Sequence, residues 1–367
     1  MPPTGQQATA LKSKKRRPLL LRILRFTWKT FKTLVSGIIL FLFLFWLLFK
    51  VPAVQNWLAN RTTDILSKEW NTVVRIGRVD IQLFDHAVLE DVYVEDLHQD
   101  TLIFAQELTA YFNVSEILKG RFIITEAHLH DGFFQLQRLE GEEKHSLQFI
   151  LDYFAPKNKK KRKKKAPFEL AINHIHTHHA RFHMLDMLPG VEVDAYIEEG
   201  VIHTNFSNLL AQTVLCDSVH LADANIKVRI FPGTPVPSLK NKAPSGFKPP
   251  KWTVSSNLVR IKNMNFSLLN EKMGKKPDAP LDFNDLQFSN TQVLFTNMSL
   301  KNDSLQLYAQ HLSGKEKRGF ELSAMKGQVL VSPKGSYVKE FELKTPYSTI
   351  GNELIFVHNE FPDFLDF

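Results

Sequence analysis

The sequence predicts a mainly β protein in which a transmembrane helix and an amphipathic helix precede an elongated antiparallel β-sheet. One uncharged apolar run lies near the N-terminus, and apolar residues recur at helical spacing just after it. After Thr72 the hydrophobic period changes to two and persists almost to the C-terminus. Helical patterns are scarce there, with Ser146 to Phe154 the best short candidate, so a doubly wound βαβ fold is excluded.

The uncharged run extends from Thr33 to Phe49 and predicts a transmembrane helix at 33–49. Such a helix spans about 26 Å, and the flanking lysines can reach out to cover a hydrocarbon core of about 30 Å. Nine Lys and Arg residues lie in the leader at 1–32, which the positive-inside rule places in the cytoplasm. The anchor residues expected to face lipid are Leu34, Ile38, Phe41, Phe45 and Trp46.

A cleaved signal peptide is the competing interpretation of this N-terminus. Val51 to Ala53 offers compact residues at a plausible cleavage position. The leader is unusually long, however, and the apolar run exceeds the usual length of about 7–15 residues. An uncleaved anchor is therefore favoured, with the bulk of the chain outside the cytoplasm.

An amphipathic helix is predicted within residues 50–72, beginning just after Pro52. Its apolar residues recur mostly at helical spacing, with polar residues between them. The apolar residues are Val54, Trp57, Leu58, Ile65, Leu66 and Trp70. Two roles remain open for this helix. It packs in a core, or it lies at the membrane surface or closes the end of a sheet.

Two β regions follow, at 73–155 and 168–367, separated by a basic loop at 156–167. Their strands are predicted from alternation of apolar and polar residues, the pattern of half-buried strands. The clearest runs are Val73 to Leu83, Leu108 to Val114, Arg121 to Leu129, Val191 to Ile197, Val214 to Ile230, Val254 to Leu268, Leu286 to Phe295 and Tyr337 to Leu343.

Five segments within these regions share a loose repeat in which the apolar parity slips by one residue. Such a slip turns side chains to the opposite face unless the backbone bulges or turns there. Asp and Asn tolerate the left-handed conformation that a kink requires. Chance similarity in a β-rich chain is the competing explanation. The repeat predicts kinked strands at Asp131, His179, Asp223, Asn263 and Asn290.

The formal net charge of +8 is concentrated in two patches, the leader and the loop. The loop carries eight Lys and Arg residues between positions 157 and 165, so the rest of the chain is acidic. This distribution argues against a general nucleic-acid surface, and no nucleic-acid partner is expected. The loop is either a solvated linker or an attachment to anionic lipid headgroups.

One histidine cluster resembles a metal site, because His174, His176 and His178 would share one face of a strand. His179 and His183 follow, but no carboxylate or Cys has a matching spacing nearby. A polar, solvent-facing strand is therefore favoured, and no metal or cofactor is predicted. The single Cys excludes an intramolecular disulfide, and no phosphate loop, H-E-x-x-H or G-x-S-x-G motif occurs. An enzyme is not predicted.

Several segments resemble the N-terminal part of the translocation and assembly module subunit TamB of the AsmA-like superfamily, in its bacteroidete form. The resemblance runs along nearly the whole chain. It is carried by the anchor with its leader, Val51 to Asn60, Val74 to Ile81, Val88 to Asp96, Asp100 to Leu102, Ile117 to Gly120, the lysine-rich loop and Lys344 to Tyr347. The block from Val51 to Asp96 is the most specific part.

The resemblance implies a single-pass inner-membrane protein whose periplasmic β-sheet curls into a groove with an apolar lining. The implied role is outer-membrane biogenesis, through phospholipid transport or through assembly and secretion of outer-membrane proteins. The implied partners are inner-membrane phospholipids and an outer-membrane barrel protein of the BamA/TamA type. The family has no catalytic residues to carry over. The expected groove residues are Leu129, Phe134, Leu136, Leu221, Ile226, Val228, Ile261, Phe266, Leu268 and Phe288.

TamB proteins are generally several times longer, so we expect this sequence to be an incomplete form. A second hypothesis, from another class, is a β-sandwich binding or adhesion module on a membrane stalk. A sandwich needs two apolar sheets that face each other, whereas a groove leaves one apolar face open to ligand.

Overall fold

The computed structural model describes residues 19–356 apart from 83–84, 120, 155–168, 209–212, 235–252, 277, 302–303 and 333–334. The chain divides into two compact units, Met1–Val54 and Gln55–Phe367. The first part of the basic leader and the whole lysine-rich loop lie outside the described residues. The helices are α1 (Leu19–Phe49), α2 (Pro52–Trp70), α3 (Val114–Leu118) and α4 (Gln148–Phe154).

The first unit is built on α1, which begins earlier than the uncharged run. Its segment Thr27–Leu48 is long and apolar enough to span a membrane. The helix extends back into the leader because Lys and Arg are good helix formers. Lys32 also places its ammonium 5.5 Å from the centroid of the Trp28 ring. All five predicted anchor residues have exposed side chains, as a lipid-facing helix requires.

The helix α2 packs against the first strands of the sheet, in agreement with the core-packing role left open by the sequence. Gln55, Ala59 and Thr63 recur every four residues and form its buried stripe. The Ser67 hydroxyl accepts a hydrogen bond from the Val74 amide at 3.0 Å, which ties the helix to the sheet. The predicted apolar stripe is divided, because some of its residues pack inward while Trp57 and Ile65 are exposed.

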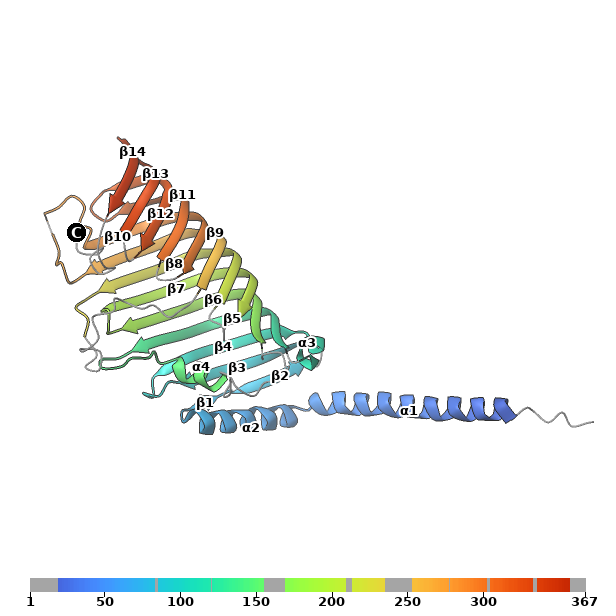
Figure 1. The fold of residues 1–367 in the computed structure, drawn as a ribbon. Coiled ribbons are helices and arrows are strands. Elements are labelled where there is room, and N and C mark those ends of the chain that lie inside the picture. The colour runs from blue at the N-terminus through green and yellow to red at the C-terminus, as the bar shows by residue number, and fades with distance from the viewer. Residues whose placement is uncertain are drawn as a thin grey trace, which may run out of the picture. The chain divides into compact units, whose positions relative to one another are not determined.

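All the described strands belong to a single sheet, in which β2 pairs with β3 beside a path from β1 to β14 (Figure 1). This confirms the predicted mainly β fold. The strands are β1 (Val74–Arg75), β2 (Arg78–Gln82), β3 (His86–Glu95), β4 (Thr101–Phe112), β5 (Arg121–Arg138), β6 (Glu169–Asp186), β7 (Val191–Asn208), β8 (Thr213–Ile230), β9 (Thr253–Asn270), β10 (Asp285–Lys301), β11 (Ser304–Glu316), β12 (Glu321–Ser332), β13 (Gly335–Lys344) and β14 (Thr349–Phe356).

Neighbouring strands pair antiparallel except at two places, β5 with β6 and β8 with β9. A parallel pair needs a crossover connection of a dozen or more residues. The connections at 139–168 and 231–252 meet this requirement, whereas most others are short turns. The sheet is therefore antiparallel-rich, with its two parallel pairs at the two longest connections between strands.

The five predicted kinks are confirmed by the backbone. Each marker residue has a positive φ, between 48° and 54°, inside a strand that continues on both sides. In Figure 1 the long strands bend partway along their length. These left-handed residues are Asp131, His179, Asp223, Asn263 and Asn290.

The two sides of the strands differ in burial at the kinks. Directly after the kinks, Gly132, Ala224 and Met264 are buried, and a side chain at the first of them would displace Leu129. A Cβ added to Gly132 would lie 2.5 Å from a methyl of Leu129. Four of the five kink residues are exposed, and His179 is half-buried. Buried residues directly after the kinks and mostly exposed kink residues thus distinguish the two sides of the sheet.

An N-terminal cluster of apolar side chains covers the first strands of the sheet. Its buried residues are Val74, Val94 and Leu102, the last only 1% exposed. Helices α2 and α4 contribute the partly buried covering side chains, and Trp70 meets Phe149 edge to face at 6.0 Å between ring centroids. One buried apolar cluster of this unit thus lies where helices pack on the sheet, and a second one, formed by Ala224, Met264 and Val293, is packed by strand residues.

Candidate functional site

The ten residues predicted to line a groove fall on three rows that cross the strands from β5 to β10. Paired residues in adjacent strands present their side chains to the same face of a sheet. The first row contains Leu136, Val228 and Leu268; the second contains Phe134, Ile226, Phe266 and Phe288; the third contains Leu129, Leu221 and Ile261.

These rows form one continuous apolar face on both sides of the kinks. Ile261 precedes the kink in β9 and Phe266 follows it, yet both pack against the cluster of Ala224, Met264 and Val293. A regular strand would send these two side chains to opposite faces, because their separation is odd. The left-handed kink residue restores them to one side. We call this surface the apolar face.

All ten predicted residues are half-buried. They contact neighbours within the sheet, but among the described residues no second sheet packs against them. Phe134 differs from the rest because it also packs against the N-terminal cluster. The apolar face is therefore covered at its N-terminal end and partly accessible from β6 onward.

Two further residues of this face, a phenylalanine and a methionine, were not among the residues predicted to line the groove. Phe182 and Met184 pair with Phe134 and Leu136 across the parallel strands. The Phe134 and Phe182 rings stack with centroids 5.8 Å apart. Both belong to the second repeat unit, so the repeat itself carried the signal that would have identified them.

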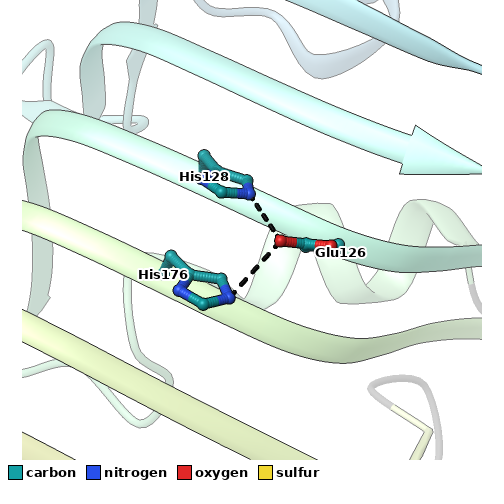
Figure 2. A group of neighbouring side chains, drawn as sticks. All are labelled: Glu126, His128 and His176. Carbon is teal, nitrogen blue, oxygen red and sulfur yellow. Dashed lines mark hydrogen bonds and ion pairs between the residues drawn. The ribbon is translucent and has the colours of Figure 1, made fainter.

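The opposite face carries the histidines. His176 and His128 are directly paired across β6 and β5, and their rings stack at 4.7 Å with an interplanar angle of 13°. Glu126 lies beside them, with its Oε1 2.7 Å from His128 Nε2 and 3.4 Å from His176 Nε2 (Figure 2). The sequence near the histidines offers no carboxylate at a matching spacing. Glu126, fifty residues before His176, supplies one because β5 and β6 pair in parallel.

The remaining predicted histidines make other contacts. His174 packs edge to face on His203, and His178 stacks on His179 at 4.0 Å. His179 lies at a kink, where its Nε2 is 2.8 Å from Glu198 and its Nδ1 is 3.1 Å from Asp131. The hydrogen bond to Glu198, followed by that to Asp131, raises the pKa of His179. His183 Nε2 lies 3.1 Å from Glu192. His179 and His183 therefore have carboxylate partners, whereas His174 and His178 make ring contacts on the same polar face.

We compared the sequence with protein-family models and with curated proteins. No protein-family model matches the chain, and no curated protein matches it.

Proposed function

We propose that this chain is a membrane-anchored, non-enzymatic protein whose apolar face binds phospholipid acyl chains during outer-membrane biogenesis, as in the TamB and AsmA-like proteins that its sequence resembles. The continuous, half-buried apolar face supports this proposal most directly. Each CH₂ group that leaves water contributes about 0.8 kcal/mol. A partly covered row of leucine, isoleucine and phenylalanine side chains suits an acyl chain better than a polar ligand.

The proposed location is the inner membrane, with the N-terminus in the cytoplasm and the sheet in the periplasm. The candidate span in α1 and the nine basic residues before Thr33 support it. The exposed Trp57 and Ile65 of α2 follow the span closely in sequence. An outer-membrane barrel protein of the BamA/TamA type is the proposed receiving partner, on the resemblance alone.

The orientation is tested by a reporter that is active only outside the cytoplasm. Fused after Leu66, it should be active, because the leader keeps the N-terminus in the cytoplasm. The mature protein should also retain its first fifty residues. A mature N-terminus at Val54 would instead establish a signal peptide and remove the anchor from the proposal.

The binding function is tested by mass spectrometry of phospholipid that copurifies with the full chain. Ile226→Asp should reduce the retained lipid severalfold, because it places a carboxylate on the apolar face. Asn225→Asp is the matched control, since this neighbouring residue is exposed on the opposite face and should leave lipid retention unchanged.

The alternative, a β-sandwich binding module, predicts a different pair of results. There the parent protein would retain no lipid, and Ile226→Asp would unfold the domain by burying an unpaired charge. That combination would overturn the lipid proposal.

A further inference from the structure

Glu126, His128 and His176 form a compact donor set on the polar face of the sheet. The ligand atoms of the three side chains lie within 4.8 Å of one another. Two donors come from alternate positions of β5 and the third from the adjacent β6. Figure 2 shows both imidazole rings turned toward the same carboxylate oxygen. The three side chains converge although they come from two strands.

The distances from Glu126 to the two histidines can be compared with those in a tetrahedral cation site. Zinc binds His nitrogen and Glu oxygen at about 2.0–2.2 Å, which separates tetrahedral ligands by about 3.4 Å. The Glu126 to His176 distance already has this value, and the Glu126 to His128 distance needs a small opening. Two imidazoles and one carboxylate, with one position open, make a known ligand set for zinc.

All three side chains remain partly accessible, so a cation can enter from solvent.

We propose that Glu126, His128 and His176 bind a divalent transition-metal ion, Zn²⁺ first among them. The ion would link β5 to β6, whose connection spans residues 139–168. A parallel pair is slightly less stable per residue than an antiparallel one, and a long connection does little to fix its register. The metal acts as a clamp on this pair and leaves the apolar face on the other side untouched.

The test is a titration of the full chain, purified in detergent without a polyhistidine tag, with Zn²⁺ and with Co²⁺ as a spectroscopic probe. The wild-type protein should bind Co²⁺ with the visible absorption of a tetrahedral site. His176→Gln and Glu126→Gln should each weaken binding by more than about 100-fold, the upper end of what loss of a supporting residue costs. Zn²⁺ should raise the thermal midpoint of the wild type but not of these variants.

Two control variants decide whether the site is the one proposed. His220→Gln removes a histidine of β8 outside the donor set and should leave binding unchanged. His179→Gln disrupts a second group, formed by His178, His179 and Glu198. Loss of binding in His179→Gln with retention in His176→Gln would overturn the proposal. So would a wild type that binds no more tightly than His176→Gln, while unchanged circular dichroism excludes misfolding as the cause.

Discussion

The two ends of one row of side chains across the sheet differ sharply in solvent exposure. The row runs through directly paired residues from Val79 in β2, through Leu129 and Ile261, to Ile350 in β14. Val79 is 6% exposed, whereas Ile350 is 57% exposed. The same alternating pattern thus produces a core at one end and an accessible surface at the other.

The first end of the sheet is covered by helices, whereas no described helix covers the last. The N-terminal cluster is buried because α2 and α4 place Leu66, Trp70 and Phe149 on the sheet. From β6 onward the structure describes no helix, and the buried cluster of Ala224, Met264 and Val293 is packed by side chains of other strands. A graded series of aspartate substitutions along the apolar side of the sheet should therefore produce graded losses of stability.

The largest effect is expected from Leu102→Asp in the N-terminal cluster. A carboxylate at this fully buried position is an unpaired charge and costs several kcal/mol, a large part of a typical stability of about 5–15 kcal/mol. We expect the protein to lose cooperative unfolding, measured by tryptophan fluorescence in urea. Leu102→Met is the control, because it conserves volume and should cost less than about 1.5 kcal/mol. Equal loss in both variants would mean that charge is not the cause.

A smaller effect is expected from Phe266→Asp in the middle of the apolar face. This side chain is half-buried, so the variant loses only a fraction of the about 1.5–3 kcal/mol of full burial. The urea midpoint should fall measurably while unfolding remains cooperative. Asn265→Asp, one residue away on the exposed face, should leave the midpoint unchanged. Complete unfolding of Phe266→Asp would contradict an accessible face and favour a covered one.

Ile350→Asp should have a still smaller effect, within about 0.5 kcal/mol, because the side chain is already exposed on β14. Limited proteolysis and the urea midpoint should match those of the wild type. A loss as large as that of Phe266→Asp would show that β14 is covered in solution, and the contrast between the two ends would disappear.

The smallest expected effect is the pH dependence of the stability contributed by His179, the kink residue of β6. Because the folded pKa of His179 lies above its ordinary value of 6.5, its protonated form is favoured by folding. This contribution is fully present below pH 6.5 and is lost as the pH rises through the raised folded value. The difference in thermal midpoint between wild type and His179→Gln should therefore shrink from pH 6 to pH 8. A difference that grows with pH would reverse the assigned direction.

The sequence predicted the kinks better than it predicted the chemistry on the sheet. Parity slips reveal a kink because they are local, and Asp223 and Asn263 adopt positive φ as expected. The Glu126 and His128 partners of His176 are not local, because they depend on the parallel register between two strands that thirty residues separate. The division of α2 into a buried stripe with Gln55 and an exposed side with Trp57 also depends on the sheet against which it packs.

The central claim is that the apolar face contacts acyl chains, and photocrosslinking in intact membranes tests it most directly. A photoreactive phenylalanine analogue replaces Phe266 on the apolar face or Asn265 on the opposite face of the same strand. Irradiation followed by mass spectrometry of the full chain should reveal phospholipid adducts at position 266 and none at 265. Adducts of equal yield at both positions, or crosslinks from 266 only to protein, would contradict the claim.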